Sequence, residues 1–478
     1  MKAIVLLILS ACLAQAAPLA RLRVSENGRF FVKEDGSPFF WLGDTSWSLF
    51  HLTREDVDLY LKDRAAKRFT VIQAIVAHYG GLEKPNPYGQ TVFVNNDPTR
   101  PNEAYFQHVD YAINEAESLG LYVALVPIWS KEYVTPEKSV LDKASAFSYG
   151  KFLGTRYRNK PVLWILGGDW VPDGIEDIWR SMAAGIAEGD GGTHLKTYHP
   201  RGVRSSSMYF HQEAWLDFNM LQSGHSLFNR NYELVAGDYA RVPAKPVVDG
   251  ESAYEGIANN LAPYKPGVRL IQAEDVRRIA YCAMFAGAAG YTYGSNGAYS
   301  YLSNSNPRGS GAWGPEVTFR EALDRPAGKQ MQYMRNLLES RPMLERVPDQ
   351  WLIVEDPMST TERIQACRGA DRSYAFVYTA TGKAVRIRLR DTVIQTIAGQ
   401  VIRAYWYDPR TGTATRIEDY TKPAAGDNER SQALSRLYTP PSGGPGNDWV
   451  LVLEDASRNY PPPGRSGGAQ SGATRSGR

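Results

Sequence analysis

The chain has 478 residues, and 54 lysines and arginines stand against 51 aspartates and glutamates, so its formal net charge is only +3. So small an excess gives no electrostatic argument for a nucleic-acid partner, and a hydrophobic fraction of 43% excludes a chain that is disordered throughout. The length exceeds that of one average domain, so we expect two. The 11 tryptophans and 28 tyrosines serve core packing in most proteins, but their rings also suit stacking on sugars.

The first 17 residues read as a signal peptide. Lys2 supplies the charged start, Ala3–Leu13 the apolar stretch and Ala14–Ala16 a small-residue cleavage site. We therefore expect export to the periplasm or the extracellular space. Cys12 ends a lipoprotein-like box, but the stretch before it is short for a lipid anchor. No later segment is long and apolar enough to predict a membrane span, and nothing in the sequence indicates an oligomeric state.

Residues 18–342 predict an α/β domain of the (β/α)8 TIM-barrel type. A β-hairpin at 21–38 comes first, and apolar strand-like runs then alternate with amphipathic helix-like stretches. The predicted strands are Phe39–Gly43, Phe69–Val76, Leu121–Pro127, Val162–Gly167, Leu195–Tyr198, Phe218–Gln222, Pro246–Asp249 and Ala288–Tyr293. The predicted helices are Thr53–Lys67, Asn102–Leu119, Ala144–Arg158, Ile175–Glu188, Leu270–Ala286 and Pro326–Ser340. An open doubly wound sheet is the alternative, but no glycine-rich phosphate loop follows the first strand.

The pattern changes after about Arg341. Residues 343–456 predict a small antiparallel β-sandwich, because short strands follow one another with turns and without helical periodicity. The predicted strands are Trp351–Glu355, Ser373–Thr379, Lys383–Arg390, Val401–Tyr407, Thr413–Ile417 and Asp448–Glu454. Residues 457–478 are rich in proline, glycine, serine and arginine and predict a disordered tail.

Two strand endings carry carboxylates. The run from Pro161 stops at glycine and presents Asp169, and the run from Lys245 stops at Gly250 and presents Glu251. In a barrel these are the ends of the fourth and seventh strands, which meet at the carboxyl mouth where sites are built. Glycoside hydrolysis needs such a pair, one carboxyl to protonate the leaving oxygen and one carboxylate to act at the anomeric carbon or on water.

Other strand ends supply candidate substrate-binding residues on the same face. These are Asp44, Trp47, Gln73, His78, Trp129, His199, His225, Tyr293 and Asn296. Each also has an ordinary structural interpretation, such as helix capping for Asp44 or a satisfied buried histidine. Asp249 and Glu255 flank Glu251 and are its rivals for the role of nucleophile.

The sequence predicts neither a metal nor a cofactor. The histidines lack the spacing that places two ligands on one element, and no Gly-x-Ser-x-Gly elbow marks a serine hydrolase. Once Cys12 is removed with the signal peptide, Cys282 and Cys367 remain. Because they fall in different predicted domains, we expect two free buried thiols rather than a disulfide.

Four segments together resemble a known family. The opening from Asn27 to Trp47, Trp164–Asp169 and Gly250–Gly256 resemble the apiosidase-like catalytic domains of glycoside hydrolase family 140. Trp406–Gly412 resembles the C-terminal module that usually accompanies them. The resemblance covers about residues 21–455.

The resemblance implies a (β/α)8 barrel and a retaining double displacement, with Asp169 as acid/base and Glu251 as nucleophile. It also implies an oligo- or polysaccharide substrate, and the family's known activity is hydrolysis of β-apiosyl linkages in the pectin rhamnogalacturonan II. Two alternatives stay open from the residues alone: a polysaccharide lyase, and a non-catalytic carbohydrate- or collagen-binding protein. The sequence does not identify the sugar, the linkage or endo as against exo action.

Overall fold

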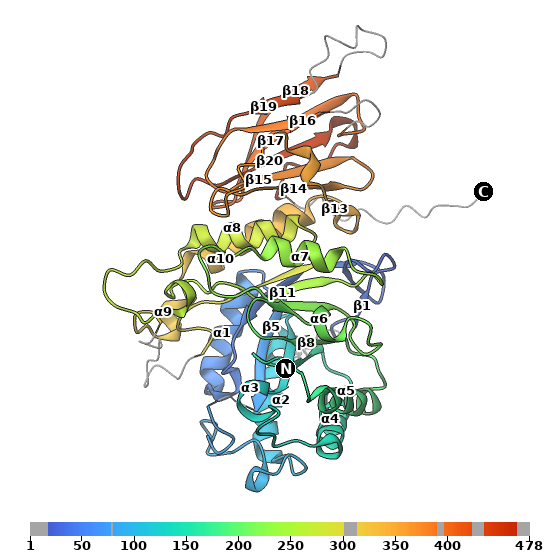
Figure 1. Cartoon of the computed structure of the whole chain (residues 1–478), viewed down its shortest axis with the longest axis vertical. Helices are drawn as coiled ribbons and strands as arrows, with labels where there is room; N and C mark the ends of the chain where they lie inside the picture. Colours follow the sequence, from blue (N-terminus) through green and yellow to red (C-terminus); the bar gives the residue numbers. More distant parts are fainter. Residues whose placement is uncertain (1–17, 78–79, 301–312, 390–395, 423–434, 466–478) are drawn as a thin grey trace, which may run out of the picture.

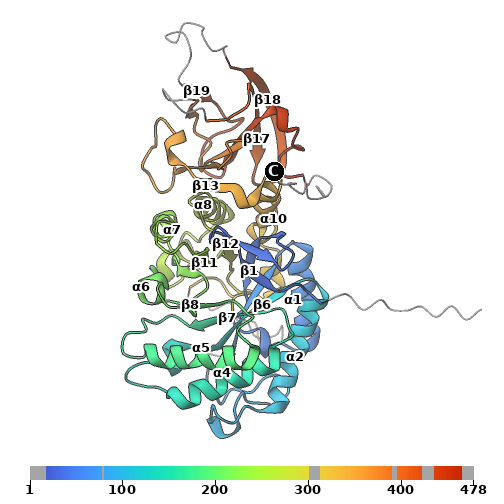
Figure 2. The same ribbon diagram turned by 90° about the vertical axis from the view of Figure 1, so that its right-hand side faces the viewer.

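The computed structural model of the protein describes residues 18–77, 80–300, 313–389, 396–422 and 435–465. The predicted signal peptide therefore lies outside the described residues. An N-terminal barrel with its surrounding helices forms one body, and a C-terminal body of strands is stacked on it (Figure 1). Helices α8 (Ala273–Phe285) and α10 (Pro326–Glu339) lie between the barrel strands and this second body, as both views show (Figures 1 and 2).

Eight parallel strands form the barrel, which confirms the predicted fold class. They are β4 (Trp41–Thr45), β5 (Val71–Ala77), β6 (Tyr122–Ile128), β7 (Val162–Gly167), β8 (Lys196–His199), β10 (Asn219–Gln222), β11 (Val247–Glu251) and β12 (Gly290–Tyr293). The remaining helices are α1 (Arg54–Ala66), α2 (Glu103–Ser118), α3 (Ser130–Tyr133), α4 (Lys143–Tyr157), α5 (Glu176–Asp190), α6 (Ser207–Phe210), α7 (Asn231–Tyr239) and α9 (Phe319–Leu323). Short 3-10 turns are η1 (Leu49–His51), η2 (Val94–Asn96), η3 (Asn259–Leu261), η4 (Met343–Glu345), η5 (Gln350–Leu352) and η6 (Ala456–Arg458).

The barrel closes at a seam between β8 and β10. The strand ladder runs in the order β8-β7-β6-β5-β4-β12-β11-β10, and β9 (Arg204–Ser205) is added antiparallel to β10. Across the seam, the Asp217 N–H donates to the Lys196 carbonyl and the Lys196 N–H donates to the Asp217 carboxylate. The Thr197 hydroxyl donates to the carbonyl of Phe218. Individual contacts of this kind complete the circle.

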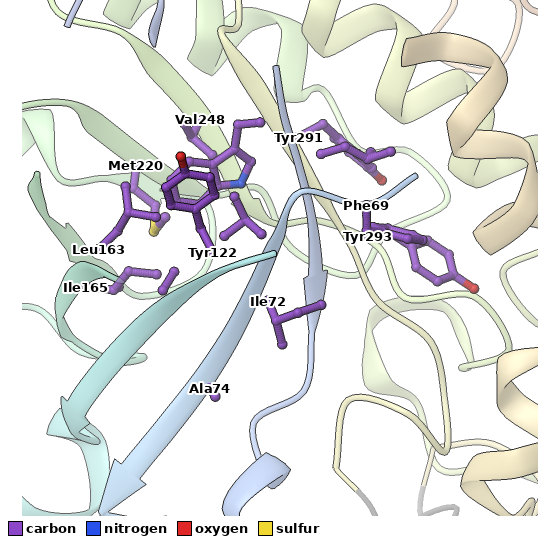
Figure 3. Close-up of a cluster of buried hydrophobic side chains, with 14 of the residues drawn as sticks. Phe69, Ile72, Ala74, Tyr122, Leu163, Ile165, Met220, Val248, Tyr291 and Tyr293 are labelled. Carbon is purple, nitrogen blue, oxygen red and sulfur yellow. The ribbon is translucent and has the colours of Figure 1, made fainter. Parts of the chain in front are cut away.

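The barrel strands are buried on both faces, because side chains fill the interior and helices cover the outside. Strands β5, β6 and β7 contain only buried residues. Figure 3 shows part of this packing, in which Leu163, Met220 and Val248 come from three different strands. Such burial explains why these strands read in the sequence as continuous apolar runs.

A three-stranded sheet covers the amino end of the barrel. It consists of β1 (Leu22–Val24), β2 (Phe31–Lys33) and β3 (Pro38–Phe39), and the first two form the predicted hairpin. The Phe31 ring lies 5.8 Å from that of Trp41 and meets Phe218 edge-on at 5.2 Å. This closure leaves the carboxyl end of the strands as the open mouth.

The C-terminal body is an antiparallel β-sandwich, as predicted. Its six-stranded sheet contains β13 (Arg346–Pro348), β14 (Ile364–Gly369), β15 (Tyr374–Thr379), β20 (Trp449–Asp455), β17 (Val401–Asp408) and β18 (Thr413–Thr421). A second sheet pairs β16 (Val385–Arg388) with β19 (Ser435–Tyr438), and an apolar core lies between the two sheets. The predicted strand Trp351–Glu355 is wrong: the chain makes the 3-10 turn η5 there. Strands β13, β14 and β19 were not predicted.

The other face of the large sheet packs on the barrel. Tyr378 of β15 stacks on Tyr281 of α8, with ring centroids 5.0 Å apart and planes 8° apart. Arg277 of α8 makes a buried ion pair with Asp448, at 2.6 Å. Aromatic residues of this face belong to the same apolar cluster as the barrel core, so the two domains share a core.

The structure also tests the predictions for the two cysteines and for the C-terminal tail. Cys282 and Cys367 are free and buried, as predicted, and burial raises the pKa of each to about 12. The expectation of disorder from residue 457 is wrong for 457–465: Tyr460 donates to Ser373 at 3.0 Å, and the Pro461 carbonyl accepts from Arg341. Residues 466–478 lie outside the described residues. Among the helices that are described, none is both long and apolar enough to cross a membrane.

Candidate active site

Asp169 lies on a tight turn immediately after β7. Gly167, Gly168 and Asp169 all have positive φ angles, of 85°, 128° and 52°. A Cβ atom on Gly168 would lie 2.5 Å from the Trp129 ring, so only glycine fits there. The Gly168 carbonyl accepts from the backbone of Lys131, and its N–H donates to His199 O, each at 3.0 Å. Both hydrogen bonds hold the residue that precedes Asp169, and the backbone of Asp169 is itself strained.

Glu251 is the last residue of β11, and donors surround its carboxylate. His199 Nε2 lies 3.0 Å from Oε2, and His225 Nε2 lies 3.3 Å from Oε1. The Tyr254 hydroxyl donates to Oε1 at 2.7 Å and accepts from Trp47 Nε1 at 3.2 Å. Burial, and then the charge of Glu251, raise the pKa of Tyr254 well above its ordinary value, so the phenol remains a donor.

The two carboxyl groups are pushed toward opposite protonation states. Burial, followed by the negative charge of Glu251, raises the pKa of Asp169, and His199 and Lys131 offset this only in part. Burial also opposes ionisation of Glu251, but the close contacts and positive charge of His199 and His225 outweigh it and hold the pKa of Glu251 well below its usual range. A pair of carboxyl groups with separated pKa values is suited to one acid and one anionic role.

His199 links the pair. A carboxylate oxygen of Asp169, a ring nitrogen of His199 and a carboxylate oxygen of Glu251 all lie within 4.8 Å of one another. Burial would lower the pKa of His199, but contact with Glu251 and the charges of both carboxylates raise it. A protonated imidazole donates to a carboxylate and has no lone pair on that nitrogen for a metal. The spacing of the three groups also suits a metal ion, but contact with Glu251 favours the protonated form of the His199 nitrogen that faces it and raises the pKa of His199.

Two cavities adjoin these groups. The first, which we name the aromatic cavity, has a volume of about 250 Å³. Its lining consists of Trp47, Trp129, Lys131, Glu132, Asp169, His225, Glu251, Tyr254, Ile257, Leu261, Tyr299 and Trp313. Its walls carry the flat rings that stack on sugar C–H faces, and both carboxyl groups reach it. A separate cavity of about 400 Å³ lies near the amino ends of β6 to β8 and is far from this pair.

The second, which we name the cationic cavity, has a volume of about 560 Å³ and begins on the other side of Asp169. It shares Lys131, Asp169, His225 and Leu261 with the aromatic cavity. Arg201, Trp170 and Gln222 are among the residues that only this cavity contains. Glu251 lines the aromatic cavity alone, whereas Asp169 lies at the junction. A proton donor at Asp169 can therefore reach an atom that bridges the two cavities.

Four of the predicted binding residues gather at the carboxylate pair. Trp47, Trp129 and His225 line the aromatic cavity, and His199 contacts Glu251. Gln73 lies beneath the site instead: its amide donates to the carbonyl of Gly250 at 2.9 Å, so it supports the strand end that carries Glu251.

Three other predicted binding residues are placed elsewhere. Asp44 is fully buried and pairs with Arg64 and Tyr60 of α1, outside the barrel interior. Burial raises the pKa of Asp44, and Arg64 opposes the shift. Tyr293 donates to Glu255 at 2.6 Å, and Asn296 donates to the Pro315 carbonyl at 2.8 Å. These three buried residues have partners within the protein and line neither of the two cavities.

The last predicted binding residue is His78, and the two alternative nucleophiles are Asp249 and Glu255. His78 lies outside the described residues. Glu255 accepts from Tyr293 and is buried beside α10. Asp249 accepts hydrogen bonds from Ser223 and Asn231 and is fully buried. Neither rival lines either cavity, which leaves Glu251 as the carboxylate of the seventh strand that faces the site.

Several site residues were not predicted. They are Tyr254, Tyr299, Trp313 and Arg201, which lie on loops after barrel strands, and Lys131, which lies on the short helix α3 after β6. Tyr254 had the clearest sequence signal, because it lies only three residues after Glu251, in the loop that follows β11. The others come from long connections whose path no periodicity describes.

Comparisons with known proteins identify the family. The family model described as "Apiosidase-like, catalytic domain" matches residues 25–345, well over half of the chain. The chain belongs to the apiosidase-like family. A second model, "Putative collagen-binding domain of a collagenase", matches residues 347–454. No curated protein compared with this apiosidase-like chain matches it significantly.

Solved structures agree with this assignment. A glycoside hydrolase of family 5 from Bacteroides vulgatus is 33% identical, with a TM-score of 0.82, over 92% of this chain and 94% of that one. Another structure, described as a glycoside hydrolase, is 32% identical, with a TM-score of 0.81, over 92% and 97% of the two chains. The apiosidase-like protein is therefore a glycoside hydrolase, as predicted, and its substrate is a carbohydrate.

Proposed function

We propose that this protein is a retaining glycoside hydrolase that acts on pectic glycosides, with β-apiosyl linkages of rhamnogalacturonan II as the first substrate to test. The observation that carries the proposal is the pairing of Asp169 with Glu251. Their nearest oxygens lie within 4.8 Å, a separation that suits direct attack by a carboxylate better than attack by an interposed water. The opposite directions of their pKa shifts support the same division of roles.

In the first step, a Glu251 oxygen forms a bond to the anomeric carbon as the bond to the leaving oxygen breaks. Asp169 gives its proton to that oxygen, so the leaving group departs as a neutral alcohol. In the second step, Asp169 takes a proton from water, whose oxygen attacks the anomeric carbon and releases Glu251. His199, His225 and Tyr254 hold the free carboxylate before the first step and after the second.

The two cavities support an acidic substrate. The aromatic cavity, which holds Glu251, receives the sugar that is attacked, and the cationic cavity beyond Asp169 receives the leaving portion. Lys131 and Arg201 line that second cavity, and a uronate of a pectic chain carries the complementary charge. A polymer outside the cell also requires an exported enzyme, so we propose export through the signal peptide predicted at residues 1–17.

The decisive experiment incubates the full-length protein with rhamnogalacturonan II oligosaccharides, other pectic oligosaccharides and aryl glycosides, and identifies the released sugar. Proton NMR of the first-formed anomer distinguishes retention from inversion. Glu251→Gln should abolish turnover while the circular dichroism spectrum stays unchanged. Turnover retained in that variant, or an inverted first product, contradicts the proposed mechanism. Release of a sugar other than apiose replaces only the proposed substrate.

A further inference from the structure

The loop that carries His225 is attached at both ends to one buried residue that touches neither cavity. The loop connects β10 to α7, and its middle is held by Asn259 of η3, which accepts from the Leu227 N–H, and by Arg278 of α8, which donates to the Leu227 carbonyl. Asp249, two residues before Glu251 on β11, is completely buried. Its Oδ2 atom accepts a hydrogen bond from each end of the loop.

At the start of the loop, the Ser223 hydroxyl donates to Asp249 Oδ2 at 2.9 Å. The backbone N–H of Ser223 donates to the carbonyl of Glu251, also at 2.9 Å, and that of Gly224 does so at 3.4 Å. Ser223, two residues before His225, is thus fixed to the strand that carries the nucleophile through both its side chain and its backbone.

At the end of the loop, Asn231 Nδ2 donates to the same Asp249 oxygen at 2.8 Å and to the Ile279 carbonyl at 3.0 Å. Asn229 joins the two ends, because its amide donates to Ser223 Oγ at 3.0 Å and to the Gly224 carbonyl at 2.7 Å. All four polar side chains are at most 5% exposed. These hydrogen bonds connect both ends of the loop through Asp249 Oδ2, whereas Asp249 Oδ1 and Asn231 Oδ1 have no hydrogen-bond partner among the described residues.

We propose that Asp249 is a positioning residue, which fixes the loop of Ser223 to Asn231 so that His225 meets the carboxylate of Glu251. The role rests on the proposed function of Glu251 as nucleophile, but the placement of the loop does not. His225 Nε2 lies 3.3 Å from Glu251 Oε1, so a small displacement of the loop removes a donor from a buried anion. Misplacement by about 1 Å can reduce a rate by about 100-fold.

The first test measures loop order without any substrate. Hydrogen exchange followed by mass spectrometry should show faster exchange of the 223–231 amides in Asp249→Ala than in the wild type. Asp249→Asn should restore protection, because its single carbonyl oxygen can accept both hydrogen bonds. Asp238→Ala is the matched control, since Asp238 is 4% exposed, lies on α7 and accepts from two serine hydroxyls outside the loop. Unchanged exchange in Asp249→Ala overturns the proposal.

The second test is a double-mutant cycle on glycoside turnover. Asp249→Ala should lower kcat by about 10- to 100-fold in the wild type. In a His225→Ala background it should lower kcat by less than about 3-fold, because the two residues act through one contact. Equal losses in both backgrounds overturn the proposal. If Asp249→Ala does not fold, Ser223→Ala carries the same cycle, because it removes only one hydroxyl.

The two proposals can fail separately. Full activity of Glu251→Gln would remove the proposed function, and the exchange experiment would still decide the role of Asp249. Inactivity of Glu251→Gln together with unchanged loop exchange in Asp249→Ala would remove the positioning role alone.

Discussion

Lys131 should lower the pH at which the enzyme loses its proton donor. Its Nζ atom lies 3.8 Å from Asp169 Oδ2, and a nearby cation favours the ionised carboxylate. Replacing it in Lys131→Met should therefore raise the pKa of Asp169. Activity requires protonated Asp169 and is lost as pH rises through its pKa, so the basic limb of the profile should move to higher pH.

The size of the shift follows from the distance and the exposure. Two unit charges 3.8 Å apart interact by about 1.1 kcal/mol in water and about 4.4 kcal/mol at an effective dielectric constant of about 20. The Lys131 side chain is 53% exposed, so the lower figure is the better guide, and exposed pairs measure about 0.2–1 kcal/mol. At about 1.36 kcal/mol per pKa unit, the limb should move by about 0.2 to 0.8 pH unit.

The assay is the pH dependence of kcat/KM on a neutral glycoside whose leaving group is a weakly acidic phenol. A weakly acidic leaving group needs the proton from Asp169, and a neutral one avoids direct contact between Lys131 and a substrate charge. High salt should shrink the difference between variant and wild type. Lys143→Met is the control, because Lys143 pairs with Asp177 on the surface at 2.6 Å. A limb that moves to lower pH, or moves equally in the control, refutes the electrostatic argument.

Two further substitutions test the glycine turn before Asp169 and the buried ion pair between the two domains. Gly168→Ala should lower kcat by about 100-fold, because its Cβ would meet the Trp129 ring at 2.5 Å and displace the turn; Gly36→Ala, also at positive φ but with open space around it, should keep kcat. Arg277→Met should lower the free energy of unfolding by about 3–5 kcal/mol in urea, because it leaves the buried carboxylate of Asp448 without its arginine partner. Lys62→Met removes an exposed pair and should cost at most about 1 kcal/mol; equal losses would contradict the burial argument.

The carboxylate pair could be predicted from sequence because of how parallel strands are built. A strand buried on both faces reads as an apolar run, and glycine followed by a carboxylate marks where it ends. Counting such runs placed Asp169 and Glu251 after the fourth and seventh strands, and the structure has them there. Burial on both faces also conceals the direction of each side chain. Asp44 lies on β4, where all five residues are buried, so the pattern could not tell that it points toward Arg64 of α1.

In the C-terminal domain, the sequence pattern predicted one strand that does not form and missed another that does. The apolar run from Trp351 to Val354 has strong strand character, yet η5 turns there and the Trp351 ring packs under Arg388. Strand β14 has the sequence Ile-Gln-Ala-Cys-Arg-Gly, and Ile364 to Cys367 are all buried because the sheet is covered on both sides. Alternation is lost there, and its small and polar residues carry little strand propensity, so pairing with β15 decides the structure.

The shared core has a consequence for how the protein meets an insoluble or polymeric material. A binding module on a flexible linker searches a volume around its enzyme and can attach in many orientations. Here the β-sandwich is fixed to α8 by stacked rings and a buried ion pair. Any surface on the sandwich that contacts a polymer is therefore held at a constant distance and angle from the barrel mouth. Attachment at that surface would select which bonds along the polymer can enter the aromatic cavity.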